Sequence, residues 1–274
     1  MTLEDHLGDI IRKARLMAKL DAGATAQAAG LSAADYAALE DAGKPAGAVN
    51  FSALGALLHL NPARLEGIAR GWLPPRIDTT RWREFRQITT DDGGMAVHNY
   101  LVWDEVTRDA AAFDTGWKIE PVARLIEENG LTLRHIFITH THHDHIAALE
   151  PLRNQYPRAL LHTDTKGAPP QHRNRRNDCI QLGSLRITNR DTPGHVEDGV
   201  TYLVGNWPDD APHVAIVGDA IFAGSMGGAK EHGALARQKV REQILTLPAD
   251  TLICPGHGPL TTVGLEKQNN PFFG

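Results

Sequence analysis

The chain has 274 residues, of which 42% are hydrophobic and 22% charged, and this is the composition of an ordinary folded protein. Its formal net charge of −5 argues against a general binder of polyanions. The sequence has no apolar signal-peptide core, no run near the ~20 apolar residues of a membrane span, and only two distant cysteines, Cys179 and Cys254. We therefore expect a cytoplasmic protein without a membrane partner.

Residues 1–73 are expected to form a small all-α accessory domain. Apolar residues recur at helical spacing from Leu3 to Met17, and Thr2 with Asp5 fits a capping box at the start of this helix. Further helices are expected over residues 25–29, 33–41, 51–60 and 63–70.

One part of this region resembles a known type of domain. The sequence AxxAGLS at residues 26–32 is followed by a helix and then by Leu54, Leu57-Leu58 and Asn61-Pro62. This pattern resembles the helix-turn-helix domain of Cro/C1-type phage repressors. The resemblance implies that residues 33–41 form a recognition helix, which normally reads base edges with Arg, Lys, Asn or Gln.

The helix over residues 33–41 is poorly suited to DNA. It has no basic residue, and its large polar and aromatic side chains are Asp35, Tyr36, Glu40 and Asp41. Residues 2–73 hold seven Lys and Arg against eight Asp and Glu. Because DNA binding draws most of its affinity from phosphate neutralisation, we do not expect a nucleic-acid partner. The alternative is an accessory module that forms a homodimer or covers an active site.

The character of the sequence changes after Pro74-Pro75. We assign residues 74–81 to a linker, because paired prolines disfavour helix, and residues 82–274 to a second domain. Strands are predicted at residues 84–89, 96–103, 110–113, 131–138, 159–162, 184–188, 200–204, 214–217 and 252–253. Helices are predicted from Pro121 to Asn129 and over residues 146–156 and 234–247. Strands that lead and then alternate with helices indicate a layered α/β protein.

The stretch THTHHDH, residues 139–145, stands out in this domain. It holds four histidines and one aspartate, and it directly follows the apolar run Ile136-Phe137-Ile138, which predicts a buried strand. Strand ends are where α/β folds place their chemistry. Imidazole and carboxylate ligands suit zinc, iron or manganese. The stretch therefore predicts a metal site.

Three later strand ends each present one further candidate ligand. His195 follows Thr192-Pro193-Gly194, Asp219 follows an apolar strand that ends in glycine, and His257 lies in the sequence CPGHGP. A glycine directly precedes each of the three, and glycine lets the backbone approach a crowded centre closely.

The ordered set HxHxDH, TPGH, GD and GHG resembles the metallo-β-lactamase fold superfamily, and within it the short bacterial glyoxalase II-like hydrolases. The resemblance spans residue 82 to the C-terminus and implies an αββα sandwich with a two-metal centre between the sheets. The ligands that it implies for the first metal ion are His140, His142 and His195. Those for the second ion are Asp144, His145 and His257, with Asp219 bridging both. Zinc is the first expectation, and iron or manganese are the alternatives; His143 matches a variable position.

This site would perform a hydrolysis. Two divalent cations lower the pKa of a bridging water to near 7, so that hydroxide attacks an acyl carbon and the metals stabilise the resulting oxyanion. Asp144 would also be catalytic by orienting the hydroxide. The expected substrate is a small acyl thioester such as a hydroxyacylglutathione, whose thiolate leaving group needs little protonation.

The substrate is less well defined by the sequence. Larger glyoxalase II enzymes bind glutathione through a C-terminal helical domain, which we do not expect here because only 17 residues follow His257. Weak candidates for substrate binding are Arg173, Arg175, Arg176 and Lys230.

Other functions remain open at this stage. A lactonase or a mononuclear iron persulfide dioxygenase of the same fold are the nearest alternatives, and the dioxygenase would not need His257 as a ligand. An alternative of another class is a transcriptional regulator whose metal domain senses a ligand.

Overall fold

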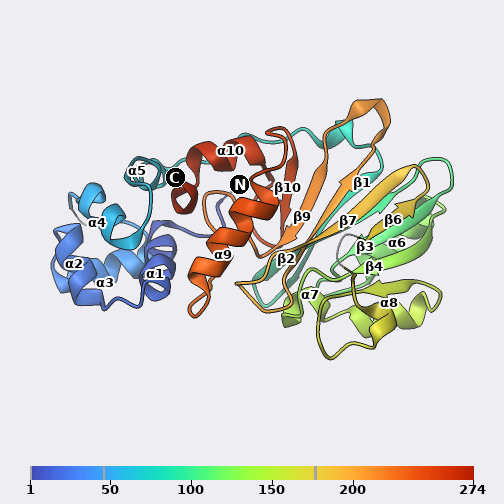
Figure 1. Ribbon diagram of the computed structural model, residues 1–274, viewed down its shortest axis with the longest axis horizontal. Helices are drawn as coiled ribbons and strands as arrows, with labels where there is room; N and C mark the ends of the chain where they lie inside the picture. The colour runs from blue at the N-terminus through green and yellow to red at the C-terminus, as the bar shows by residue number, and fades with distance from the viewer. Residues whose placement is uncertain (1, 46, 176–177) are drawn as a thin grey trace.

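The chain folds into a group of helices beside a sandwich of two sheets (Figure 1). The computed structural model describes residues 2–45, 47–175 and 178–274. Within these ranges the N-terminal helices are α1 (Leu7–Met17), α2 (Ala22–Ala29), α3 (Ala33–Ala42), α4 (Phe51–Leu58) and α5 (Pro62–Ala69). The predicted all-α region is confirmed, whereas its helix-turn-helix type stays a prediction.

Helix α1 begins later than the sequence predicts. His6 is its N-cap: the His6 ring accepts from the Asp9 N–H at 3.1 Å, and the Asp9 carboxylate accepts from the His6 N–H at 3.2 Å. The capping box expected from Thr2 and Asp5 is therefore wrong. Asp5 precedes α1, and its buried carboxylate instead accepts from the ammonium group of Lys13 in that helix.

The first sheet contains five strands in the order β1-β2-β3-β4-β5. They are β1 (Phe85–Asp92), β2 (Met95–Trp103), β3 (Asp109–Phe113), β4 (Thr132–Phe137) and β5 (Leu160–His162). The first three are antiparallel neighbours, and β3, β4 and β5 run parallel. Strand β2 alternates between two cores, because Tyr100 and Val102 face the second sheet while Leu101 and Trp103 face outward to helices.

The second sheet contains six strands in the order β11-β10-β9-β8-β7-β6. They are β6 (Cys179–Leu182), β7 (Leu185–Asp191), β8 (Val200–Gly205), β9 (Val214–Gly218), β10 (Leu252–Pro255) and β11 (Thr261–Thr262). Strands β9 and β10 are parallel, and the other neighbours are antiparallel. The core between the two sheets includes the stacked rings of Phe113 and Phe137, whose centroids lie 4.9 Å apart.

Helices cover the outer face of each sheet, which completes an αββα sandwich. Helix α6 (Glu120–Glu128) and helix α8 (Leu149–Gln155) pack on the first sheet, through side chains such as Val122, Ile126 and Leu152. Helix α9 (Gly233–Lys239), its π-helical continuation (Val240–Ile244) and α10 (Val263–Asn269) lie on the second sheet. Within the described ranges, none of the helices is long and apolar enough to cross a bilayer.

The helix predicted over residues 146–156 begins only at residue 149 in the structure. The structure has the short helix α7 (His143–Ile146) and then α8, with a break between them. Long-range hydrogen bonds cause the break: the Ala148 N–H donates to the Gly116 carbonyl at 3.1 Å, and the His145 carbonyl accepts from the Thr115 N–H at 2.8 Å. Both groups would otherwise bond within a continuous helix. The break fixes residues 143–145 against the loop that follows β3.

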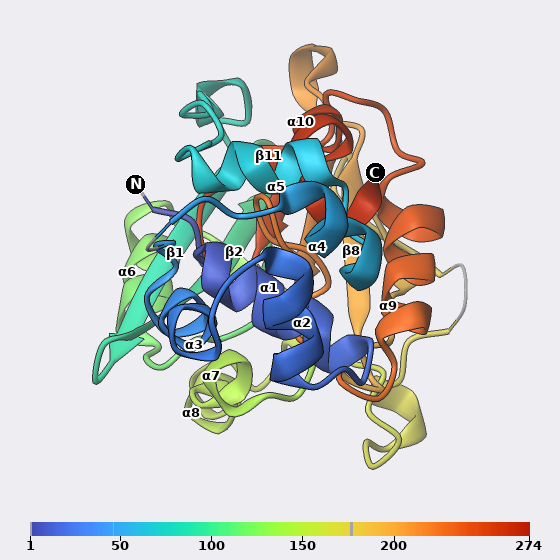
Figure 2. The ribbon, with the colours of Figure 1, turned by 90° about the vertical axis from the view of Figure 1, so that its left-hand side faces the viewer.

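The N-terminal helices share one hydrophobic core with the outer face of the second sheet. Leu54, Leu58 and Ile68 belong to the same buried cluster as Ile244 and Phe272. Figures 1 and 2 show the helices stacked against one end of the sandwich, with α1 close to α9. The N-terminal helices are therefore separated from the sheets in sequence but pack directly against the second sheet.

Polar contacts reinforce this packing. Arg237 of α9 donates to the carbonyls of Leu58 and His59 at the end of α4, at 3.4 and 2.5 Å. Arg64 of α5 donates to the Asn270 carbonyl at 3.1 Å. Because these bonds use groups at the helix end and in the C-terminal tail, they fix the direction in which the helical region approaches the sandwich.

A part-buried ion pair joins α1 to α3. Both Glu40 oxygens accept from the Arg15 guanidinium, at 2.7 and 2.9 Å, and one also accepts from the Tyr36 hydroxyl at 2.6 Å. Removing the charge leaves the part-buried guanidinium without its partner. We predict that Glu40→Gln lowers the free energy of unfolding by about 2 kcal/mol, measured by urea denaturation.

The matched control is Glu66→Gln, which also removes a helical glutamate from an arginine pair. Glu66 and Arg70 are exposed, so this change should cost less than about 0.5 kcal/mol. Equal effects of the two substitutions would contradict the role given to Glu40.

Candidate metal centre

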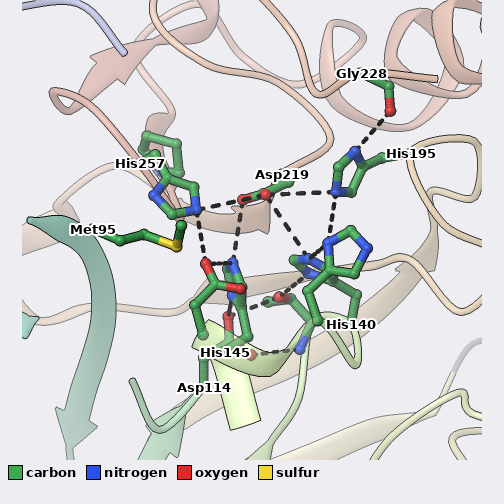
Figure 3. A network of polar contacts seen from close by, with 12 residues as sticks. Met95, Asp114, His140, His145, His195, Asp219, Gly228 and His257 are labelled. Atoms are coloured by element: carbon green, nitrogen blue, oxygen red, sulfur yellow. Dashed lines mark hydrogen bonds and ion pairs between the residues drawn. The ribbon is translucent and has the colours of Figure 1, made fainter. Parts of the chain in front are cut away.

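The side chains singled out in the sequence meet at one edge of the two sheets (Figure 3). The motif of residues 139–145 follows β4 and continues into α7. His195 follows β7, Asp219 follows β9 and His257 follows β10. Strand ends from both sheets therefore supply the site, as the sequence predicts.

The first group consists of His140, His142, His195 and Asp219. His142 Nδ1 lies 3.1 Å from His140 Nε2 and 3.0 Å from His195 Nε2. The nearer Asp219 oxygen lies 3.8 Å from His140 Nε2 and 3.5 Å from His195 Nε2. Metal–ligand distances of about 2 Å would let four atoms at this spacing surround a single ion.

The second group consists of Asp144, His145 and His257. An Asp144 oxygen lies 3.1 Å from His257 Nε2 and 3.6 Å from His145 Nε2. Asp219 also reaches this group, because its other oxygen lies 3.3 Å from His145 Nε2. The Asp219 carboxylate thus stands between the two groups (Figure 3).

Hydrogen bonds to the outer ring nitrogens orient the histidines. His195 Nδ1 donates to the Gly228 carbonyl and His257 Nδ1 to the Ala96 carbonyl, both at 2.8 Å. His145 Nδ1 lies 2.8 Å from the Asp114 carboxylate. A proton held at Nδ1 leaves the Nε2 lone pair directed at the centre, as second-shell partners do in metal sites.

Asp114 also fixes the first residue of the motif. Its carboxylate accepts from the Thr139 N–H and from the Thr139 hydroxyl, each at 2.7 Å. The Asp114 backbone has a left-handed φ of 55°, which asparagine and aspartate tolerate better than most residues. Sequence analysis missed this role, although Asp114-Thr115-Gly116 at the end of a strand marks a turn close to the motif.

The donor set fits a divalent cation. His145 Nε2 and Asp219 Oδ1 are buried and have no hydrogen-bond partner among the described residues. Buried polar atoms of this kind are costly unless a ligand satisfies them. Gly256 makes the crowding feasible, because a Cβ there would lie 2.5 Å from both Asp219 Oδ1 and His145 Cε1.

Metal binding needs neutral histidines and ionised carboxylates. In the second group, burial alone would lower the pKa of both histidines. The Asp114 carboxylate outweighs this effect at His145 and raises that pKa, and the Asp144 hydrogen bond raises the pKa of His257 to about 9. A metal ion there would therefore displace a proton from each ring.

Other candidate ligands are already in the required state. Burial lowers the pKa of His140 to about 2, and it lowers the pKa of His195 as well. Burial alone would raise the pKa of Asp219, but the charge of His145, whose Nε2 lies 3.3 Å from an Asp219 oxygen, outweighs it and holds that pKa below its usual value. Burial alone would also raise the pKa of Asp144. The hydrogen bond with His257 outweighs this effect, so the pKa of Asp144 is lowered as well.

A cavity of about 650 Å³ opens onto the site. Four of the candidate ligands line it: Asp144, His195, Asp219 and His257. Residues 93–96 of the β1–β2 hairpin form one wall, and residues 222, 227 and 228 form another. The N-terminal helical region contributes Glu4 and Lys13, which sequence analysis missed because nothing in a local pattern reports contacts across more than 200 residues.

The basic candidates lie elsewhere. Arg173, Arg175 and Lys230 do not line this cavity, and Arg176 lies outside the described residues. The Arg173 guanidinium donates to the carbonyls of Lys166 and Ala168 within its own loop. A role in substrate binding stays a prediction for these residues.

The histidines left out of the ligand set lie outside both groups. His143 is exposed, and its ring meets Trp117 edge-on at 5.4 Å. His135 and His162 pair with one another at 2.9 Å on β4 and β5.

Together, the αββα sandwich and the paired histidine–aspartate groups define a metallohydrolase-type fold with a candidate divalent metal site. Residues 92–257 match the family model described as the Metallo-beta-lactamase superfamily. The chain belongs to this superfamily.

Relatives with different names share this fold. The chain is 26% identical over 199 residues to hydroxyacylglutathione hydrolase GloC of Haemophilus influenzae, covering 63% of this chain and 91% of that protein. It is 31% identical over 181 residues to the mitochondrial persulfide dioxygenase ETHE1 of Homo sapiens, covering 63% of this chain and 69% of that protein. The crystal structure of the BLEG-1 B3 metallo-beta-lactamase matches with a TM-score of 0.58 and 27% identity, covering 69% of this chain and 99% of that one.

Asp114 offers a test of the outer hydrogen bonds. Asp114→Asn keeps the left-handed backbone but removes the charge beside His145 Nδ1, so we predict a loss of about 10–100-fold in zinc affinity. Competition with a chromophoric chelator measures this affinity. The control Asp109→Asn removes a carboxylate from a surface pair with Arg134 and should leave zinc affinity unchanged; a loss of the same size in both variants would contradict the assignment.

Proposed function

We propose that the protein is a dinuclear metal-dependent hydrolase of small acyl thioesters. The observation that carries the proposal is the position of Asp219 between the two groups of candidate ligands. One of its oxygens lies 3.3 Å from His145 Nε2, and the other lies 3.5 Å from His195 Nε2 and 3.6 Å from His257 Nε2. His140, His142 and His195 would hold one ion with Asp219. Asp144, His145 and His257 would hold the other. The identity of the metal is left to measurement, with zinc as the first choice and iron or manganese next.

Bound divalent ions would supply a water of lowered pKa and would polarise an acyl carbonyl. The chain's own groups arrange the reaction. Asp219 offsets part of the positive charge and fixes the distance between the two groups. Asp144 lines the cavity and carries a lowered pKa, so at neutral pH it is an acceptor that can orient a water toward the substrate.

Two considerations support a thioester. A thiol has a pKa near 8.5, so it leaves as thiolate without a proton from the enzyme, whereas an alkoxide needs one. The likeness to a hydroxyacylglutathione hydrolase adds to this argument, since that relative is matched over 91% of its length. A hydroxyacylglutathione is therefore the first substrate to try.

A persulfide dioxygenase is the second candidate, because the chain is 31% identical to a protein of that name. In an enzyme with one iron ion, the second group of candidate ligands would bind no metal. The close packing of His257 against Asp144 and the buried, unpartnered His145 Nε2 favour the hydrolase. Oxygen uptake with a persulfide substrate and one iron per chain would favour the dioxygenase, and a lactone screen tests the lactonase alternative.

A DNA-binding regulator is disfavoured by the side chains that α3 buries and by those that it exposes. Tyr36 and Glu40 of that helix are buried and bonded to each other, so they cannot reach a base edge. The exposed side chains of Asp35 and Asp41 are acidic. We infer instead that the helical region serves the catalytic site.

Substitution of candidate ligands tests the proposed function. His142→Ala and Asp219→Asn should each lower kcat/KM for a hydroxyacylglutathione by at least about 100-fold, since even indirect partners of a metal are worth 10–100-fold. Spectrophotometric detection of the released thiol measures the rate. Removal of metal with a chelator should abolish activity, and zinc, iron or manganese added back separately should identify the ion that restores it.

His143→Ala is the matched control, because it removes an imidazole from the same motif without touching either group. It should change kcat/KM by less than about twofold, as expected of an exposed surface side chain. Full activity in His142→Ala, or equal losses in His142→Ala and His143→Ala, would refute the ligand assignment.

A further inference from the structure

Two charged residues of the N-terminal helical region reach the cavity over the candidate metal centre. Glu4 precedes α1, and Lys13 lies on the second turn of that helix. Among the described residues that line the cavity, Lys13 is the single lysine or arginine. We propose that Lys13 binds an anionic group of the substrate, a carboxylate or a phosphate on its thiol half; this inference rests on the proposed thioester hydrolysis.

The Lys13 ammonium is held in place. Its Nζ lies 2.5 Å from an Asp5 carboxylate oxygen and 3.1 Å from the Met226 carbonyl, and it lies 5.0 Å from the centre of the Phe222 ring. These contacts use two of its three N–H donors. The third is left for a ligand, and the lysine side chain remains 23% exposed.

The anchor of this lysine is itself buried. The Asp5 carboxylate accepts from the Ser225 hydroxyl at 2.5 Å, and Ser225 lies in the turn that follows β9. A surface lysine would lose side-chain entropy on binding a ligand, whereas Lys13 is already ordered by the protein. The contact of α1 with this turn therefore presents a fixed cation to the cavity.

The position of the cation along the cavity follows from its neighbours. Lys13 touches residues 222 and 226, in the loop that also supplies the Gly228 carbonyl to His195. The Glu4 backbone lies beside Gly258, next to His257, because a Cβ on Gly258 would come within 3.0 Å of the Glu4 nitrogen. An anionic group that contacts Lys13 would bind on the His195 side of the cavity.

The cavity is large enough for a substrate with two parts. A volume of about 650 Å³ lies within the range of roughly 300–1,000 Å³ that small-molecule sites occupy. With the acyl carbon near Asp219, a thiol half that extended toward the N-terminal wall would reach Lys13. The cation on that wall would then select thiols that carry negative charge over neutral thiols.

The test compares three thioesters with the same acyl group. Glutathione supplies carboxylates, coenzyme A supplies phosphates, and N-acetylcysteamine is neutral. A hydrogen bond to a charged group is worth about tenfold or more in binding, so Lys13→Gln should lower the ratio of kcat/KM for the anionic to the neutral thioester by about tenfold, mainly through KM. If the ratio falls for the glutathione thioester, Lys13 binds a carboxylate; if it falls for the coenzyme A thioester, Lys13 binds a phosphate.

Two further variants make the result specific. Lys13→Arg keeps the charge and should retain most of the wild-type ratio. Lys19→Gln removes the same charge just beyond the end of α1, where Lys19 is 71% exposed and pairs with Glu231 at 3.5 Å, and should leave the ratio unchanged. An unchanged ratio in Lys13→Gln for both anionic thioesters would overturn the inference.

A labelling measurement on the wild-type protein decides the case if Lys13→Gln does not fold. The S-methyl thioethers of glutathione and coenzyme A cannot be hydrolysed, and one of them should protect Lys13 from acetylation relative to Lys19. Equal labelling with and without both thioethers would overturn the inference. Failure of the proposed function gives a different result, in which the metal-loaded wild-type protein hydrolyses none of the three thioesters.

Discussion

The Asp219 carboxylate is the constraint on which the rest of the site depends. It is buried, and it faces three histidines on one side and the Asp144–His145–His257 group on the other. A carboxylate with no cationic partner would be costly at this depth. The surrounding structure is built to keep it ionised and fixed, through strand β9 beneath it and Gly256, whose lack of a side chain lets the backbone after β10 pass it closely. The hydrogen bonds at Nδ1 of His145, His195 and His257 then direct the Nε2 atoms of these rings toward the same small volume.

The helical region completes this site, even though its sequence resembles a domain of another purpose. Its helices bury their apolar faces in the same cluster as the outer side of the second sheet. Helix α1 reaches the turn after β9 through Asp5 and places Lys13 in the cavity wall. Relatives of the same fold carry names as different as hydrolase, dioxygenase and lactamase. In this chain, residues that precede the sandwich make one wall of the cavity over the candidate metal centre.

Local patterns predicted a layered α/β protein with a metal site, and the resemblance of the ordered motifs to a known superfamily implied the αββα sandwich and the division of the candidate ligands. Apolar strands gave the sheets, and a glycine before His195, Asp219 and His257 marked the strand ends that converge. Sequence reasoning failed where long-range bonds compete with local preference. The helix expected from residue 146 begins only at residue 149, because Ala148 and His145 form hydrogen bonds with Gly116 and Thr115. The short strands β6 and β11 are set by pairing with β7 and β10 more than by their own residues. Lys13 and Glu4 were missed for the same reason, because they reach the cavity only by packing against residues between 222 and 258.

The central claim is that these residues hold two metal ions that share Asp219. A crystal of the zinc-loaded protein, with diffraction measured on both sides of the zinc absorption edge, tests it most directly. The account predicts two anomalous peaks per chain, one among His140, His142 and His195 and the other among Asp144, His145 and His257, with Asp219 contacting both. A single peak in the first group, with His257 left unliganded, would contradict it.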